Sequence, residues 1–494
     1  MRFFVSWALT FCLACFGTSQ VLAQSSSGGE GNPGRGNPGG GDRPSAGGGV
    51  VADFTTLMNL IQQTITPDDW LDNGGSNTMI PYPNGVFVDP KGQLKRVEVV
   101  NVDRSIEQRM RNAAKEPAQG NRAWQNTSDL RMVSLKKLDQ ALFEIAAGRS
   151  AMSADVIRLG GLNQISYVLI DPTSEDIILA GPASPDRTGF FLEDLAVVCA
   201  LVNQQTQPLG CSIEPKQDRL LATQRFLAQP DAGNLLSKSP KRFAEQLGST
   251  IGDYDVEIFG MNPRCGTAVA LVAADEHMKE LGFGKVSLPI NIKSYFDHLE
   301  AQNAVPNQSM IRWWFAFTEE PITTNESRSL FSLPKNCVRV LSEQQFVTQT
   351  GRKPTGGNDP AADAFALELS QKMNQVRNYE QNYGRLCCVF ESALALQLAL
   401  DGSGMADLRP WFPNLCGLGK LDHWKGSEPK SVPGLVTTQA LKKKKVNVAV
   451  ISGGVTINPK SLTQSNNIKV SSLLSGSAVP NTAKQPEGKV WWWD

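Results

Sequence analysis

The sequence is poor in histidine, and this scarcity narrows the reactions that can be expected of it. His277, His298 and His423 are the only histidines in 494 residues. A catalytic zinc site usually takes two or three converging histidines, but His277 has no second histidine one helical turn away. A catalytic pairing of His277 with Cys265 is conceivable, although no local signature supports it. We therefore expect neither a metal nor a cofactor.

The sequence also lacks the short motifs of two large enzyme classes. It has no Gly-x-Ser-x-Gly nucleophile elbow, and GFGKVS at 282–287 lacks the spaced first glycine of a phosphate-binding loop. A carboxylate pair for glycoside hydrolysis leaves no linear trace, because the two acids need only meet in space. Catalysis by acids alone therefore stays open, with Glu319 and Glu320 as the first candidates.

Neither sign of charge is in excess. Lysine and arginine number 48, aspartate and glutamate also number 48, and the charged fraction of 19% is below the usual value of about 25%. Nucleic-acid binding usually requires a basic patch or stripe. No nucleic-acid partner is expected, and the partner is otherwise unknown.

The first 23 residues, MRFFVSWALTFCLACFGTSQVLA, have the pattern of a secretory signal peptide. Arg2 gives a positive start, residues 3–16 are largely apolar, and residues 21–23 fit a cleavage site. A lipoprotein signal that uses Cys15 is the alternative. No later run approaches about 18 apolar residues, so no transmembrane segment is expected after cleavage. The protein is predicted to be exported, and to be periplasmic, at the cell surface or secreted.

A Gly/Pro/Ser-rich segment follows at 24–50 and repeats a Gly-Asn-Pro-Gly unit. This composition is typical of a disordered tether, and a specific binding tail is the alternative. The 494 residues minus the first 50 leave 444, enough for several domains. The expected parts are a helix-joint-hairpin module at 51–115, a mixed core domain at 116–350, a helical hairpin at 351–430, a β-hairpin at 431–465 and a flexible tail at 466–494.

Residues 66–80, TPDDWLDNGGSNTMI, are interpreted as a joint between a helix at 54–65 and a strand-turn-strand unit at 85–100. Pro67 ends the helix, because the residue before a proline is pushed out of the α region. Gly74 and Gly75 permit a reversal of the chain. The aspartates around Trp70 lack the ligand spacing of a calcium loop, so a surface acid cluster is favoured over a metal site.

Several stretches resemble proteins of planctomycete bacteria. LMNLIQQTITPDDWLDNGG is similar to a module, Thr-x-x-Pro-Asp-x-Trp-x-x-x-Gly-Gly, that recurs in their exported proteins. RMVSLKKLDQAL, ISYVLIDPTSEDIILAGP, ADEHMKELGFG with IRWWF, and ISGGVTINP resemble one family known only as a domain of unknown function. The likeness covers most of residues 120–460. It implies export and a shared fold, and it supplies no catalytic residue.

Helix and strand patterns alternate through the middle of the chain, which predicts a mixed α/β or α+β fold. Ser134 is the expected N-cap of a helix that ends at Gly148. Asp275 and Lys279, one turn apart, are expected to form a surface ion pair. The other expected elements are strands at 165–170 and 176–180 joined as a hairpin, a helix at 191–202, a strand at 255–259 and a helix at 267–281.

The stretch MIRWWFAF at 310–317 predicts a strand with Trp313 and Trp314 on opposite faces. The pair is the best local candidate for a carbohydrate or peptide platform. The alternative is a strand that is covered on both faces. Glu319 and Glu320 follow directly, so this segment is also where a catalytic carboxylate would be sought first.

Seven of the nine cysteines lie after residue 23. Disulfides are permitted in an exported protein, but seven is an odd number and too few for a disulfide framework. Cys199 and Cys211 are candidates for one disulfide across a helix-to-strand turn. The adjacent Cys387 and Cys388 are expected to fill core space.

The C-terminal third predicts two helices and a strand pair. Asp359 and Pro360 start the first helix, and a second helix follows at 385–400. Lys442 to Lys445 precede a strand at 446–450, and Gly453-Gly454 is expected to turn it into a second strand. The lysines suit a solvated loop or contact with anionic polymers. The run Trp491-Trp492-Trp493-Asp494 either packs back on the fold or contacts a partner.

Two functions follow from these patterns. The first is an exported, non-catalytic protein that binds or scaffolds an envelope polymer or another exported protein. The alternative is a periplasmic or surface hydrolase that acts on glycan or peptide through a carboxylate pair. The hydrolase requires a cleft that joins Trp313 or Trp314 with Glu319 or Glu320.

Overall fold

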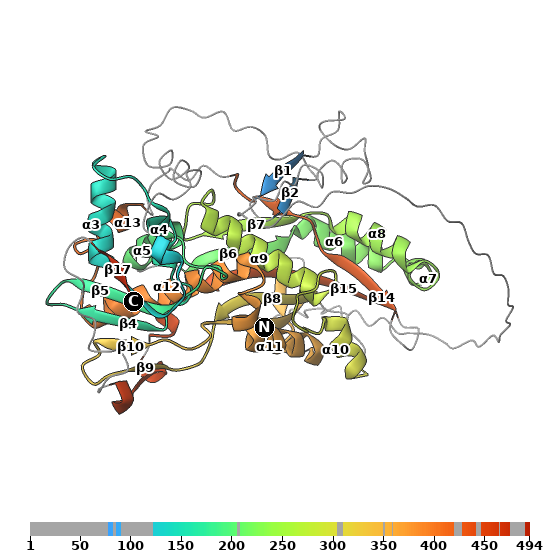
Figure 1. Ribbon diagram of the computed structural model, residues 1–494. Helices are drawn as coiled ribbons and strands as arrows, with labels where there is room; N and C mark the ends of the chain where they lie inside the picture. Colours follow the sequence, from blue (N-terminus) through green and yellow to red (C-terminus); the bar gives the residue numbers. More distant parts are fainter. Residues whose placement is uncertain are drawn as a thin grey trace, which may run out of the picture. The chain divides into compact units, whose positions relative to one another are not determined.

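The computed structural model (Figure 1) describes residues 78–82, 85–89, 122–204, 208–303, 310–348, 351–357, 359–418, 427–440, 446–463, 465–474 and 490–494. Contacts divide the chain into two compact units, residues 1–97 and 98–494, and each is described by itself. The predicted signal peptide, the linker, the lysines at 442–445 and the joint with Pro67, Trp70, Gly74 and Gly75 lie outside the described residues.

One hairpin is described in the first unit. Strand β1, Thr78–Tyr82, pairs antiparallel with β2, Gly85–Asp89. The sequence predicted β2 as the first strand of a hairpin with a strand after it. The structure pairs β2 with the strand before it, across two residues, and two-residue connections are the commonest in hairpins. The predicted partner lies outside the described residues.

The second unit contains two mixed sheets. In the smaller sheet, the predicted hairpin forms β4 and β5, with Ile170 opposite Ile177. β3 pairs with β5 on one side and with β17 on the other. The strand order is β16 (Ile468–Val470), β9 (Ile322–Thr324), β10 (Leu330–Ser332), β4 (Tyr167–Asp171), β5 (Asp176–Ala183), β3 (Ser128–Ser134) and β17 (Trp492–Trp493).

The larger sheet takes strands from both halves of the second unit. β8 pairs antiparallel with β11 and parallel with β15, which pairs in turn with β6. The first half of β15 forms a hairpin with β14, Val436–Ala440. The strand order is β12 (Gly351–Pro354), β11 (Val338–Thr348), β8 (Met310–Phe317), β15 (Val446–Ile457), β6 (Leu209–Pro215), β7 (Tyr254–Phe259) and β13 (Ser431–Val432).

Eleven α-helices are found within the described residues, so the predicted mixed α/β class is confirmed. α9 runs across the larger sheet (Figure 1) and contacts β6, β8 and β15. The helices are α3 (Leu135–Ala146), α4 (Ala154–Ile157), α5 (Leu192–Gln204), α6 (Gln217–Leu227), α7 (Ala232–Lys238), α8 (Pro240–Ile251), α9 (Gly266–Gly282), α10 (Tyr295–Ala301), α11 (Pro360–Val376), α12 (Gln381–Ser403) and α13 (Pro413–Leu418).

Helix α12 is the central helix of the core. Its Tyr383 and Phe390 make ring contacts with Phe315 and Phe317 of β8, and it also contacts α5, α9 and β4. By length and composition α12 is apolar enough to cross a membrane, but 83% of its most apolar 18-residue window is buried inside the protein. Its apolar character therefore matches its place between the two sheets.

Local sequence signals explain where two of the helices begin. The Ser134 Oγ accepts a hydrogen bond from the Lys137 amide at 3.1 Å at the start of α3. Asp359 accepts hydrogen bonds from two amides of the first turn of α11, and Pro360 occupies the first helical position. Side-chain caps satisfy amides that have no partner inside the helix. Both predicted starts are confirmed.

Two predictions at the contact of α9 with β15 were wrong. Gly453 and Gly454 form no turn, because β15 continues unbroken through them. A Cβ at Gly453 would lie 2.3 Å from the Asp275 Oδ1, which accepts a hydrogen bond from the Gly454 amide at 2.6 Å. Because Gly453 has no side chain, the Asp275 carboxylate can pack directly against the backbone of β15. Asp275 and Lys279 are 2.7 Å apart and buried, not at the surface, because α9 is covered by the sheet, α5 and α12.

Candidate functional site

The two predicted platform tryptophans have different environments. Trp313 is fully buried and packs against Phe365 of α11, with ring centroids 4.4 Å apart. Trp314 is half-buried and points to the opposite face of β8. The alternation along β8 is confirmed, but Trp313 is a core residue and has no surface to offer a ligand.

Charged side chains surround Trp314 on this second face of the larger sheet. The Arg312 guanidinium lies over the Trp314 ring at 5.0 Å from its centroid. Arg312 also forms an ion pair with Glu214 of β6 at 3.5 Å, and Arg352 of β12 contacts the same carboxylate. The register of β11 puts Arg339 on this side as well. We call Glu214, Arg312, Trp314, Arg339 and Arg352 the arginine face.

Partial burial shapes the electrostatics of the arginine face. Burial lowers the pKa of Arg312, and the charge of Glu343 opposes that shift. Burial also lowers the pKa of Arg352. Both guanidinium groups remain charged because the usual pKa of arginine is above 12. A charge that is partly removed from water interacts more strongly with an oxygen acceptor than a fully solvated charge does.

The two candidate catalytic glutamates are exposed. The side chain of Glu319 is 79% exposed, and its carboxylate pairs with Arg339 at 2.7 Å. Glu320 directly follows and is also exposed. Neither can meet Trp313, which is 0% exposed. Glu319 therefore belongs beside the arginine face, because it is paired with Arg339. The predicted site that combines Trp313 with Glu319 or Glu320 is not formed.

The sequence missed most of the arginine face. Side chains alternate between the two faces of a strand, so Arg312 and Trp314 lie on the same face of β8. The contact of Arg312 with Trp314 could therefore have been predicted from the sequence. Glu214 and Arg352 lie on strands that are distant in the chain and reach Arg312 only when the sheet is formed. No linear spacing indicates such a cluster.

A carboxylate pair does exist elsewhere, at the start of α5. Arg385 of α12 contacts Asp194 at 2.6 Å and Glu193 at 3.4 Å. Burial raises the pKa of Glu193, while Arg385 opposes that shift. The Gly266 amide and the Thr267 hydroxyl donate to the two acids. These contacts tie α5, α9 and α12 together inside the protein, and acids in the first turn also suit the helix dipole.

A second buried ion pair joins α11 to α12. Arg377 and Glu391 are 2.5 Å apart, and both side chains are nearly inaccessible. Arg377 also donates to the Asn163 carbonyl at 2.7 Å, and Glu391 accepts from the Ile165 amide at 3.0 Å. The predicted core cysteine Cys388 is buried beside this pair. The network connects α11 and α12 to the segment that precedes β4 in the smaller sheet. Both charged side chains are buried within it.

The two described histidines have local partners. The Nδ1 of His277 is 2.9 Å from the Tyr383 hydroxyl. Burial lowers the pKa of His277. The Nε2 of His298 is 3.0 Å from Glu368. Cys265 is the N-cap of α9, where its Sγ accepts a hydrogen bond from the Ala268 amide. A Cys265–His277 pair is not formed, because the two residues lie twelve positions apart along α9, about 18 Å at the helical rise per residue.

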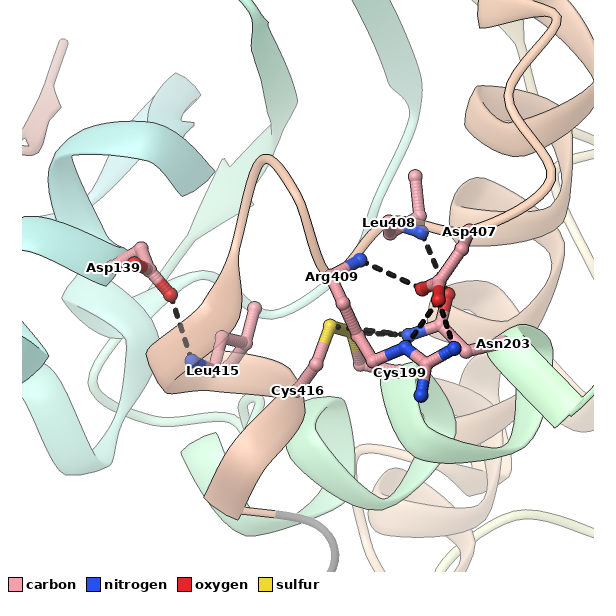
Figure 2. The surroundings of a disulfide bond; sticks show 8 residues. All are labelled: Asp139, Cys199, Asn203, Asp407, Leu408, Arg409, Leu415 and Cys416. Atoms are coloured by element: carbon pink, nitrogen blue, oxygen red, sulfur yellow. Dashed lines mark hydrogen bonds and ion pairs between the residues drawn. A yellow bond between two sulfur atoms is a disulfide. The ribbon is translucent and has the colours of Figure 1, made fainter.

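The disulfide of the described chain joins Cys199 of α5 to Cys416 of α13 (Figure 2). The predicted pair of Cys199 with Cys211 was wrong. Cys211 is a buried free thiol in β6, opposite Val455 of β15, whereas Cys199 lies where α5 packs on α13. The Cα atoms of the bonded pair are 5.3 Å apart although 217 residues separate them in sequence.

Hydrogen bonds hold both sides of this disulfide in place. The Asn203 Nδ2 lies 3.2 Å from the Cys416 Sγ, and its Oδ1 accepts from the Leu408 amide at 2.8 Å. Asp139 of α3 accepts from the Leu415 amide at 2.7 Å (Figure 2). The segment before α13 is thus attached to both α3 and α5. A disulfide typically contributes about 2–4 kcal/mol to stability.

Comparison with known proteins matches part of this chain to a protein family. Residues 211–295 match a family described as "Protein of unknown function (DUF1598)", and this span runs from β6 to the start of α10. It includes Cys211, Glu214, Asp275 and Lys279. Within the described residues, no group of three or more His, Cys, Asp or Glu side chains is placed to hold a metal ion. No curated protein and no solved structure is significantly similar to this chain.

Proposed function

We propose that this chain is an exported, non-catalytic protein that binds a polymer of the cell envelope. The observation that carries the proposal is the half-buried Trp314 on the arginine face, next to Arg312 and its partner Glu214. An indole offers a flat apolar surface, and the flanking charges offer donors and acceptors to hydroxyl, amide or carboxyl groups.

The Cys199–Cys416 disulfide supports export. Disulfides persist in the periplasm, at the cell surface and outside the cell, and they are rare in the cytosol. The signal-peptide pattern of residues 1–23 and the resemblance to exported planctomycete proteins point the same way. The disulfide is a ground from the structure, whereas the other two are grounds from the sequence.

The contacts of the glutamates favour binding over hydrolysis. Glycoside hydrolases of the common kind need two carboxylates that face each other across the sugar. Glu214 faces Arg312 and Arg352, and Glu319 faces Arg339. Each of these two acids is held by a guanidinium group.

The test is cosedimentation of the purified chain with insoluble envelope material. We expect the wild type to bind and Trp314→Ala to bind about tenfold more weakly, a loss of about 1.4 kcal/mol. The matched control is Phe143→Ala on α3, an exposed ring that also has an arginine, Arg149, over it. This control should bind as the wild type does.

Equal binding by Trp314→Ala and the wild type would contradict the proposal. A hydrolase screen on the same preparation tests the alternative. If the wild type cleaves a glycan or peptide and Glu320→Gln abolishes that turnover, the non-catalytic proposal must be abandoned. Loss of binding in both Trp314→Ala and Phe143→Ala would show that the arginine face has no special role.

A further inference from the structure

The last four residues, Trp491 to Asp494, lie against the outer edge of β3 in the smaller sheet. Trp492 and Trp493 form β17, which pairs antiparallel with β3. The carbonyl of Trp491 accepts a further hydrogen bond from the Ser134 amide at 2.9 Å. This is strand addition at a sheet edge, a mode in which extended peptides are bound.

Arg131 of β3 holds the acidic end of this segment. Its guanidinium donates from Nε and from one terminal nitrogen to the two oxygens of Asp494, at 2.7 and 3.0 Å. The remaining donors bind the backbone carbonyls of Trp124, Asn126 and Gly160. Arg131 is fully buried. Such a fork-shaped arrangement is specific for a carboxylate.

Each indole of the segment has its own site. Trp491 is 6% exposed and joins the main core. Trp492 lies over Arg131 at 4.5 Å from its guanidinium carbon, and its Nε1 donates to Asp155 at 3.3 Å. Trp493 packs with Met132 in a separate apolar cluster. The segment is therefore recognised by side chains, by backbone and by charge.

The geometry points to a peptide receptor, formed by the β3 edge with Arg131, that accepts residues 490–494 from a second copy of this chain. The contacts above join these residues to the β3 edge, to Arg131, to Asp155 and, through Trp491, to the main core. The fifteen residues 475–489 can span at most about 50 Å when fully extended. Exchange between two copies recreates contacts that already exist within one chain, as in other swapped segments. The buried Arg131 favours a carboxylate partner, whether residues 490–494 come from the same chain or from the second copy.

The test uses two variants with complementary defects. The acceptor is the chain that ends at residue 489, so its receptor is vacant. The donor is the full-length Arg131→Ala variant, which keeps residues 490–494 but cannot hold Asp494. We expect each to be monomeric alone and a mixture to form a one-to-one complex in analytical ultracentrifugation. Adding Asp494→Asn to the donor should weaken the complex about tenfold or more.

A synthetic peptide, Val-Trp-Trp-Trp-Asp, supplies the second measurement. The acceptor should bind it, and the version ending in asparagine should bind about tenfold more weakly. If the acceptor retains its disulfide and its far-UV circular dichroism but binds no peptide, the receptor is disproved. If the peptide binds but the donor does not, the second copy is disproved as the occupant.

A third variant covers the case in which the acceptor does not fold. A protease site is placed within 475–489 of the full-length chain, and the folded protein is cleaved there. We expect a labelled peptide in excess to displace the cleaved segment, and the same peptide with asparagine to displace far less of it. Failure of the acidic peptide to enter, or equal entry of the two peptides, would overturn the assignment.

Discussion

Each of the two sheets carries an arginine stacked on a tryptophan, but the two pairs differ in what completes them. On the smaller sheet, Arg131 lies against Trp492, is fully buried and bonds to Asp494 of the same chain. On the larger sheet, Arg312 lies over Trp314 with 26% of its side chain exposed. The Nε of Arg312 is buried and faces Glu214 at 3.5 Å, so solvent reaches only other parts of this side chain.

This comparison shows how one pair of residue types serves two purposes. Where the chain supplies the acid, the backbone carbonyls and the strand edge, the pair stabilises the fold. Where solvent reaches part of the pair, the exposed part of the arginine and the indole is available to a ligand. The predictions below separate these two situations.

The largest expected effect is on stability when Arg131 is replaced. Arg131→Ala leaves three backbone carbonyls, of which that of Gly160 is buried, and Asp494 without their donor, and we expect a loss of about 3 kcal/mol. The matched change Arg312→Ala, at a partly exposed site, should cost about 1 kcal/mol or less. Urea unfolding followed by circular dichroism measures both. Equal losses would show that the two arginines do not differ in the way proposed.

A smaller loss is expected for Asp494→Asn. The carboxylate is 49% exposed, so solvent screens its interaction and we expect a cost of about 1 kcal/mol. The amide can still accept one hydrogen bond from Arg131. Trp492→Ala should cost more, because it also removes buried apolar surface. An Asp494→Asn chain as unstable as Arg131→Ala would contradict this order.

The smallest effect is a pH dependence of the docked segment. Burial opposes ionisation of Asp494, but hydrogen bonds from Arg131 and Ser128 outweigh it, so its pKa is lowered. A carboxyl with a lowered folded pKa contributes stability above its unfolded pKa and loses it as the pH falls through the folded value. The contribution should thus be constant near neutral pH and fade below about pH 4.

Native-state proteolysis of residues 490–494 across a pH series measures this effect. The wild type should become more susceptible in acid, and Asp494→Asn should not change over the same range. A wild-type segment that loosened between about pH 6 and 8 would point to another titrating group, because an aspartate does not change charge there.

Local features of the fold were predictable from the sequence because their causes are local. Ser134 and Asp359 act on amides two or three residues away, and the faces of Trp313 and Trp314 follow from the two-residue period of a strand. The hairpin of β4 and β5 follows from its turn residues. Each of these features is complete within a few residues.

Long-range features were not predictable for the corresponding reason. Cys199 bonds to a partner 217 residues away, and Arg131 meets Asp494 across 363 residues. The Asp275–Lys279 pair has the spacing of a surface pair, but its burial depends on glycines in β15. In the arginine face, Glu214 and Arg352 join Arg312 only through sheet formation. Sequence spacing carries no information about such contacts.

Arginine-specific labelling with phenylglyoxal, read by peptide mass spectrometry, tests the central claim most directly. In the free protein, Arg131 should stay unmodified because it is fully buried, whereas Arg312 and Arg339, at 26% and 31% side-chain exposure, should react. Saturating envelope polymer should protect Arg312 and Arg339. Unchanged labelling of both in the presence of polymer that demonstrably binds would contradict the account.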